Sequence, residues 1–292
     1  MSPEASIVVV SYEMAREIPR TLLSLSAPYQ LNCPRGRVEV ILVDNGSREP
    51  PRPEQFAGLD LDLTVHHLPK VSPSPVAALN LGIAEARAPL ICAWIDGARM
   101  ASPGLVDACI RASKRHPRPV IATANYQLGP GPQYVTMLHG YDAAEEDRLI
   151  ESIGWPADGY RLFEIAAPIQ FADDRKPMME SNALFLPRAL WDELGGFDPA
   201  FASPGGGPCN PDVFIRACAA PDTRLIRIRG EATFHQIHGG VSINAAERVN
   251  AVLKALSSEY YRIRGRPMSP VRDLGWVFDP KTGSLERLEP GP

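Results

Sequence analysis

Short apolar runs alternate with helix-like segments along the first 125 residues, and this alternation restricts the fold more than any other feature of the sequence. The runs are strand-sized and rich in β-branched residues, which is typical of strands buried on both faces. Strands are predicted at residues 6–11, 38–44, 63–68, 90–95 and 120–124, and helices at residues 18–26, 75–86 and 103–115. Such alternation favours an α/β fold with a mostly parallel central sheet flanked by helices.

Polar residues stand where three of these strands end. They are Ser11, Asp44 and Asp96. Open α/β sheets bind ligands in the crevice beyond the carboxyl ends of their strands, so one hydroxyl and two carboxylates are expected on one rim. Asp44 precedes Asn-Gly-Ser and can either bond a ribose or base, or close its own turn. Asp96 precedes Gly97, and a carboxylate in this place can ligate a hard divalent cation.

The rest of the chain is less regular. Residues 127–176 are rich in Gly, Pro and acidic residues and are interpreted as a connection or loop region. Further elements are predicted as strands at 179–186 and 225–228, and as helices at 187–194, 211–219 and 244–261. Gly195 is expected to end the first of these helices. The resulting division is residues 1–125, residues 126–243 of the same domain, and residues 244–292 as a C-terminal helix and tail without a clear period.

Composition excludes several classes of protein. The net charge of -4 and the pI of about 5.9 show no basic excess, so no nucleic-acid partner is expected. Five cysteines without a C-x-x-C pair indicate a reducing compartment. No apolar run approaches the ~20 residues that span a bilayer, and the N-terminus does not resemble a secretory signal. We therefore expect a cytoplasmic protein without a transmembrane segment, and peripheral contact with a membrane stays open.

Four segments in order resemble the motifs of family 2 glycosyltransferases of the GT-A fold: Ile7–Tyr12, Val43–Ser47, Ala78–Ile83 and Trp94–Gly97. Leu194–Asp198 is also similar to that family's post-catalytic segment, so the resemblance covers roughly residues 5–240. It implies a GT-A fold with a C-terminal acceptor-side subregion. Residues 1–125 would form its nucleotide-sugar donor-binding half, and residues 126–243 the acceptor and catalytic half of the same domain. The resemblance also implies an inverting enzyme that moves a hexose-like sugar from a nucleotide diphosphate, UDP by default, to a hydroxyl acceptor. Cell-surface polysaccharide or glycolipid synthesis follows by analogy with the family.

The resemblance assigns donor-binding roles along the first strands. Ser11 and Tyr12 would sit against the nucleobase, and Asp44 would hydrogen-bond the base or the ribose. Asn80 falls where the family usually has an Arg-Asn pair near the donor, but here Leu79 replaces the Arg.

Asp96 matches the first carboxylate of the family's Asp-x-Asp motif, which contacts the ribose and the metal on the diphosphate. The second carboxylate is missing, because the sequence continues Gly97, Ala98, Arg99. Three alternatives remain open. Mn²⁺ or Mg²⁺ could sit on Asp96 with a histidine partner, Arg99 could stabilise the phosphates directly, or the protein could be catalytically inactive.

The histidine partner of Asp96 is expected after the strand at 225–228. In this place the family has a histidine that completes the metal site or touches the diphosphate. His235 and His238 occupy this place, and they could share a ligand only if the chain turns between them. His238 is preferred because Gly239 and the next glycine leave room for a phosphate near the backbone.

The remaining role is that of the general base, which takes the proton of the attacking hydroxyl. The family usually supplies an Asp at the start of a helix, and Asp212 is the match, with Arg216 one turn later. An acidic residue there also suits the helix dipole. Glu180 is a predicted acceptor contact and the alternative base. The loop with Gly206 and Gly207 would provide the mobility for closure over the donor.

Three other functions differ in how well they fit this sequence. Two enzyme classes fit it less well, and a binding module fits the same residues as the glycosyltransferase does. A Rossmann-type dehydrogenase would need a G-x-G-x-x-G after the first strand, and a nucleotidyltransferase a Gly-rich loop with a basic residue. The sequence has neither. A catalytically inactive nucleotide-sugar-binding or scaffold module is compatible with the loss of the second motif carboxylate.

Overall fold

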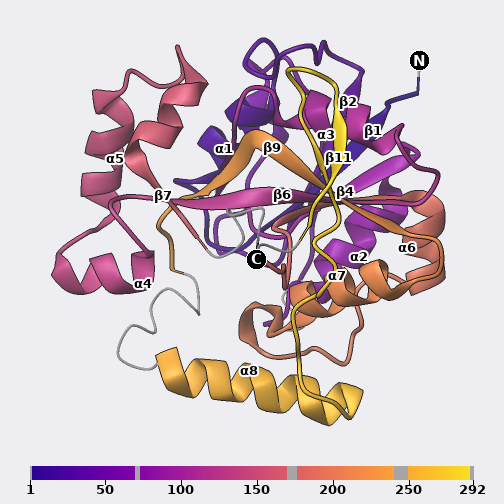
Figure 1. Cartoon of the computed structure of the whole chain (residues 1–292). Helices are drawn as coiled ribbons and strands as arrows, with labels where there is room; N and C mark the ends of the chain where they lie inside the picture. Colours follow the sequence, from indigo (N-terminus) through magenta and orange to yellow (C-terminus); the bar gives the residue numbers. More distant parts are fainter. Residues whose placement is uncertain (1, 70–72, 170–175, 240–248, 290–292) are drawn as a thin grey trace.

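The computed structural model describes residues 2–69, 73–169, 176–239 and 249–289. One sheet runs through the molecule with helices on both faces (Figure 1). Its strands lie in the order β11-β10-β9-β6-β8-β4-β1-β2-β3, while β5 pairs with β9 and β7 with β6. The bounds are β1 Ala5–Ser11, β2 Val38–Asp44, β3 Asp62–His67, β4 Leu90–Trp94, β5 Arg99–Ala101, β6 Pro119–Leu128, β7 Ala166–Pro168, β8 Ala183–Pro187, β9 Arg224–His235, β10 Trp276–Phe278 and β11 Leu285–Arg287.

The predicted α/β sheet is confirmed, and its first four strands are all parallel. β1 pairs with β2 and β4, and β2 with β3, in registers that place Ser11 opposite Asp44. Alternate residues of β1 point to opposite faces: Ile7 and Val9 belong to one buried cluster, Val8 and Val10 to the other. The β-branched runs of the sequence are therefore buried on both sides, as such strands require.

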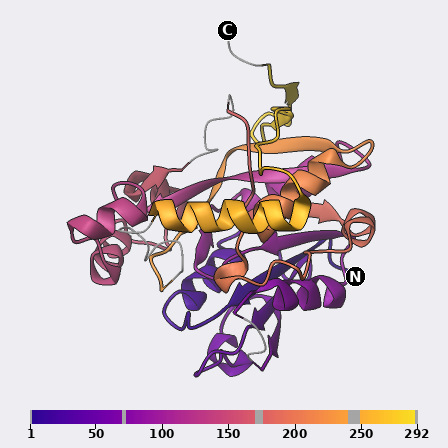
Figure 2. The ribbon, with the colours of Figure 1, turned by 90° about the horizontal axis from the view of Figure 1, so that it is seen from below.

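Helices cover these two clusters. On one face lie α1 (Ile18–Leu25) and α3 (Leu105–Ser113), and on the other α2 (Val76–Glu85), α6 (Arg188–Leu194) and α7 (Cys209–Ala219). α6 ends at Gly195, whose φ of 67° gives the left-handed cap predicted for it. α8 (Val249–Arg264) lies across the underside of the molecule (Figure 2).

The region taken for a loop, residues 127–176, is largely helical where the structure describes it, and this corrects the prediction. It contains α4 (Gln133–Thr136), η2 (Met137–His139), α5 (Ala143–Ser152) and η3 (Gly159–Ile165), and α4 and α5 form a lobe at one end of the sheet (Figure 1). The acidic residues that suggested a loop begin α5, since Asp142 caps it by accepting from the Glu145 backbone N–H at 2.9 Å.

Other boundaries also differ. β6 and β9 are both longer than predicted. β9 continues past residue 228 because its pairing with β6 contains a register shift and because Gly230 adopts a φ of 75°. β8 begins at Ala183 rather than 179, and α8 begins at Val249, since residues 244–248 of the predicted helix lie outside the described part. The tail, expected to be irregular, adds β10 and β11 to the sheet edge. Two short 3₁₀ turns complete the chain, η1 (Pro53–Phe56) and η4 (Pro204–Gly206). None of the described helices is long and apolar enough to cross a membrane.

Candidate functional site

Asp96, His235 and His238 converge beyond the carboxyl end of β4. The Nε2 atom of His235 lies 2.9 Å from Oδ2 of Asp96, and Nε2 of His238 lies 3.2 Å from the same oxygen. The two Nε2 atoms are 3.2 Å apart. Within the described part of the chain, no other set of three His, Cys, Asp or Glu side chains brings its ligand atoms within 4.8 Å of one another. The three residues predicted as metal ligands therefore form one cluster.

The backbone explains why the cluster forms. Arg99 of β5 pairs with His235 of β9, so the end of β9 is fixed beside the loop that follows Asp96. In that loop the Ala98 backbone N–H donates to Oδ1 of Asp96 at 2.8 Å, and this turns Oδ2 toward the histidines. The Gln236 N–H donates to the carbonyl of Ala98 at 2.8 Å.

Burial and charge set the protonation of these groups. Burial alone would raise the pKa of Asp96, but its interactions with His238 and His235 hold that pKa well below its usual range. Burial lowers the pKa of His235 to about 4, so this imidazole is neutral at pH 7. Burial also disfavours charged His238, yet the Asp96 carboxylate outweighs it and raises the pKa. One neutral and one readily protonated imidazole thus share one carboxylate oxygen.

Arg99 supplies a buried cation next to this cluster. Its Nη1 donates to Oδ1 of Asn125 at 2.5 Å, while its Nε has no hydrogen-bond partner. Burial lowers the pKa of Arg99, and the charges of Asp96 and Glu180 oppose this. A buried guanidinium with an unused N–H is suited to an anionic ligand such as a phosphate.

Glu180 faces Arg99 from the segment that leads into β8. Its Oε2 accepts from Nδ2 of Asn210 at 2.9 Å, and the same amide group lies 3.3 Å from Oδ1 of Asn182. The residue is only partly exposed, and burial raises the pKa of its carboxyl, with Arg99 and Asn210 acting against this. A partly open carboxylate with a raised pKa is what a general base near neutral pH needs.

Asp212 has a different environment, and the structure argues against its predicted role as general base. Its side chain is 0% exposed. Oδ2 accepts from Nε of Arg216 at 2.8 Å, and Arg264 of α8 donates to both oxygens at 2.6 and 2.8 Å. No surface remains for an acceptor hydroxyl, so we assign Asp212 a role in joining α7 to α8.

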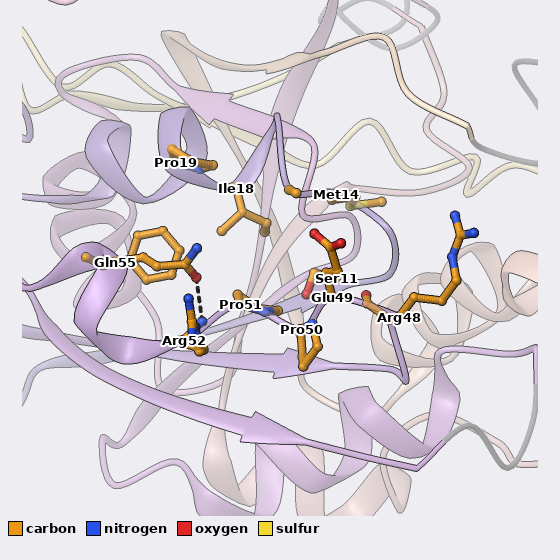
Figure 3. Close-up of a pocket in the computed structure, with 13 residues that line it drawn as sticks. Ser11, Met14, Ile18, Pro19, Arg48, Glu49, Pro50, Pro51, Arg52 and Gln55 are labelled. Carbon is orange, nitrogen blue, oxygen red and sulfur yellow. Dashed lines mark hydrogen bonds between the residues drawn. The ribbon is translucent and has the colours of Figure 1, made fainter.

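A cavity of about 440 Å³ opens beside the ends of β1 and β2 (Figure 3). Ser11, Met14 and Ile18 line one side, and the segment after Ser47 with Arg52 and Gln55 lines the other. Its size falls within the usual range of small-molecule sites. The cavity also borders the Asp96 loop, because Met14 and Ile18 pack against Gly97.

Asp44 closes its own turn at this rim. Its oxygens accept from the Gly46 and Ser47 backbone N–H groups at 3.2 and 3.0 Å and from the Ser47 hydroxyl at 2.5 Å. The Ser11 hydroxyl donates to it at 3.4 Å. These bonds support the turn interpretation of Asp44, and its contact with a base or a ribose stays a prediction.

The other predicted donor and acceptor residues have their own contacts and exposure. Tyr12 is exposed at the start of the loop after β1. Asn80, inside α2, bonds the backbone of one residue: its amide donates to the Phe197 carbonyl at 2.8 Å and accepts from the Phe197 N–H at 2.9 Å. The predicted donor contact of Asn80 stays a prediction. Gly206 and Gly207 form the turn before α7 and pack against Cys209 and Glu259.

Sequence reasoning missed four residues that support the site: Asn125, Asn210, Gln133 and Glu146. The first two hold Arg99 and Glu180. Gln133 bonds both the ring and the carbonyl of His235, and Glu146 accepts from the Ile237 backbone N–H between the two histidines. Gln133 and Glu146 come from the 127–176 region, whose polar composition hid its structure.

Gly97 tests how tightly the Asp96 loop is packed. A Cβ at this position would lie 2.8 Å from the Val10 carbonyl oxygen and 2.8 Å from Cδ1 of Ile18. Because a backbone oxygen cannot move aside, Gly97→Ala is expected to lower the free energy of unfolding by about 1–3 kcal/mol. Urea unfolding measures this. Gly58→Ala is the matched control, since its Cβ would meet nothing within 4 Å. Equal stability of the two variants would contradict the prediction.

The fold and the site define an α/β protein of the GT-A type, with a carboxylate and histidine cluster at the carboxyl edge of its sheet. The sequence profile of Glycosyl transferase family 2 matches residues 6–166, more than half of the chain. The chain therefore belongs to glycosyl transferase family 2. No curated protein matches its sequence.

Solved structures of S. aureus TarS are similar in fold. One TarS structure superposes with a TM-score of 0.53 at 15% identity, over 89% of this chain and 40% of that one. The TarS 1–349 structure in complex with UDP-GlcNAc gives a TM-score of 0.55 at 15% identity, over 89% of this chain and 67% of that one. The chain thus spans less than half the length of the first of these TarS chains, and the likeness concerns the fold.

Proposed function

We propose that the protein is an inverting glycosyltransferase that moves a sugar from a nucleoside diphosphate donor to a hydroxyl acceptor. The observation that carries this proposal is the convergence of Asp96, His235 and His238 beside the buried Arg99 and the cavity. Membership of family 2 supports sugar transfer. The UDP-GlcNAc complex of TarS supports a uridine donor, and a cell-surface polysaccharide or glycolipid is the proposed acceptor class.

In this proposal the nucleobase and ribose occupy the cavity lined by Ser11, and the diphosphate extends toward Asp96 and Arg99. Asp96, His235 and His238 would hold a divalent cation, whose chemistry when bound is to neutralise charge on the leaving diphosphate. Arg99 would add a positive charge near Asp96 that favours a phosphate in this place.

Glu180 is proposed to act on the acceptor. Its carboxylate takes the proton from the acceptor hydroxyl as the oxygen attacks the anomeric carbon, and the bond to the diphosphate oxygen breaks on the opposite side. The products are the glycosylated acceptor and the nucleoside diphosphate, with the configuration at the anomeric carbon inverted. Asn210 fixes the carboxylate by donating to Oε2 at 2.9 Å.

The test is a donor screen with the full chain. UDP, GDP and dTDP sugars are incubated with the protein and Mn²⁺, and release of nucleoside diphosphate is measured together with thermal stability. A bound nucleotide at 100 times its Kd adds about 2.7 kcal/mol to the free energy of unfolding. We expect stabilisation and release with one nucleotide series. A screen in which no nucleotide stabilises the protein would reject the proposal.

A binding module without turnover is the second candidate. The placement of Asp212 in a buried ion pair favours it, because the carboxylate matched to the family's base is closed to an acceptor. Stabilisation by a nucleotide sugar without any release of nucleoside diphosphate, over several donors and acceptors, would favour the module over the enzyme.

A further inference from the structure

One side of α8 is held firmly on the body of the molecule (Figure 2). Tyr260 is 1% exposed and stacks on Phe201, with 6.3 Å between the ring centroids. Arg264 pairs with Asp212 at 2.6 Å and with Asp198 at 2.8 Å. These contacts make α8 a fixed part of the fold, so its other side is a preformed surface.

The outer side of α8 combines apolar and basic side chains. Side chains four residues apart form rows along a helix. Two neighbouring rows are exposed along their whole length, an apolar row with Leu253, Ser257 and Tyr261 and a basic row with Lys254, Ser258 and Arg262. Tyr261 is 58% and Leu253 55% exposed, and only Leu138 has a comparable exposure among the large apolar side chains of the described residues.

The exposed charges of this part of the chain have one sign. Over residues 251–272 they are four cations that form no ion pair with another described residue: Lys254, Arg262, Arg266 and Arg272. The one acidic residue there, Glu259, is only partly exposed, and its carboxylate lies against Gly207. Asp273, which follows, is paired with Arg287 at 2.9 Å. Since the whole chain has a net charge of -4, α8 differs in sign from the protein as a whole.

A helix with exposed apolar side chains beside free cations is suited to lie on a membrane surface. Apolar side chains enter the boundary between head groups and acyl chains, and cations are attracted to anionic lipids. We propose that the outer side of α8 docks the protein on a membrane surface that contains anionic lipids. The apolar row enters the boundary layer, and the basic row contacts the phosphate groups of the lipids.

Two other partners fit this side of α8 less well. A nucleic acid would bind the cations through its phosphates, but it would leave Leu253 and Tyr261 without apolar contacts. A second copy of this chain could cover the apolar row, but a two-fold interface would place the same cations close to each other. An anionic bilayer surface is the partner that matches both rows.

Sedimentation with lipid vesicles tests the proposal. The full chain is mixed with vesicles of phosphatidylcholine alone, or of phosphatidylcholine with phosphatidylglycerol, and the pelleted fraction is measured. We expect binding to the anionic vesicles. It should fall when the salt is raised from about 0.1 M to about 1 M, because the Debye length shortens from about 10 Å to about 3 Å. Equal pelleting with both kinds of vesicle, or none with either, would overturn the inference.

A charge-reversed variant tests the basic row. Lys254→Glu combined with Arg262→Glu should weaken binding to the anionic vesicles by at least about 25-fold, since each basic residue near such a surface contributes a factor of about 5. Arg35→Glu combined with Arg148→Glu is the matched control, because it changes the net charge equally at exposed side chains outside α8. The control should bind as the parent does. Undiminished binding by the charge-reversed variant would overturn the inference.

A second variant tests the apolar row. Leu253→Ser combined with Tyr261→Ser should weaken vesicle binding by about 10-fold and leave its salt dependence unchanged. Both side chains are more than half exposed, so the fold should be kept, and circular dichroism checks this for every variant. Full binding by this variant would overturn the insertion of the apolar row.

The other two partners are tested with the same proteins. Binding to a DNA duplex without binding to vesicles would overturn membrane docking in favour of a nucleic acid. A dimer in analytical ultracentrifugation that the serine variant dissociates, again without binding to vesicles, would overturn it in favour of a second copy.

The inference goes beyond the proposed function and does not depend on it, because vesicle binding is measured without donor or acceptor. Vesicle binding without any sugar transfer would leave the docking surface standing and reject the enzyme. Sugar transfer by a protein that binds no vesicles would leave the enzyme standing and reject the docking surface.

Discussion

Glu180→Gln is expected to lower the rate of sugar transfer by about 10²–10⁴-fold, the usual contribution of a positioned general base. The amide keeps the shape of the side chain, and its oxygen can still accept from Asn210. The amide cannot take a proton, however, so the acceptor hydroxyl would still carry its proton when it attacks the anomeric carbon. The affinity for nucleoside diphosphate should stay within about 2-fold, since the lost group serves the transition state. Single-turnover rates and titration with nucleotide measure the two effects.

The pH profile provides the second readout. Burial raises the pKa of Glu180, so its ionised form is lost as the pH falls through a value above 4.5. The rate of the parent enzyme should therefore decline on the acid side earlier than an exposed Glu would cause, and Glu180→Gln should lack that decline. Glu193→Gln, a surface carboxylate paired with Arg118, is the matched control and should keep both the rate and the profile. A full rate in Glu180→Gln would reject the assignment.

Local sequence patterns were sufficient to predict the parallel half of the sheet. Residues in β1, β2 and β4 are apolar on both faces, and nothing in the local chain competes with that pattern. The prediction of these strands also gives the position of their carboxyl ends, where Ser11, Asp44 and Asp96 lie. His235 and His238 could be proposed as partners because they follow a strand and the family has a histidine there.

The supporting residues could not be predicted, because their contacts join distant parts of the chain. Gln133 and His235 are 102 residues apart in sequence, and Glu146 and Ile237 are 91 apart. Glu146 is also polar and buried, and burial raises its pKa to about 7. A local pattern assigns such a residue to a solvent-exposed loop, since only tertiary contacts supply the partners that let it be buried.

The role of Asp212 illustrates the same limit. Its place near the start of a helix fits both a general base and a favourable helix-dipole charge. The decision depends on Arg264, which reaches it from α8, 52 residues further along the chain. Within one helix, only the pair with Arg216 could be foreseen from the i,i+4 spacing.

Asp212→Asn is therefore expected to lower stability rather than catalysis. Arg216 and Arg264 would lose a carboxylate that is completely buried, and removal of one partner from a buried ion pair costs about 3–5 kcal/mol. Both guanidinium groups are about a fifth exposed, so water compensates them in part and the lower end of that range is expected. Urea unfolding measures the loss, and the transfer rate per folded molecule should stay near that of the parent.

Asp198→Asn is the matched control, because Asp198 pairs with the same Arg264 at 2.8 Å but is 27% exposed. A partly exposed pair contributes about 0–1 kcal/mol, so this variant should unfold close to the parent. The comparison separates the two roles of Asp212. If Asp212→Asn unfolds like the parent but transfers sugar more than about 100-fold slower, the carboxylate takes part in the reaction and Asp212 of α7 is the general base. If it unfolds earlier and its folded fraction keeps the parent rate, Asp212 anchors α8 and Glu180 is left as the base.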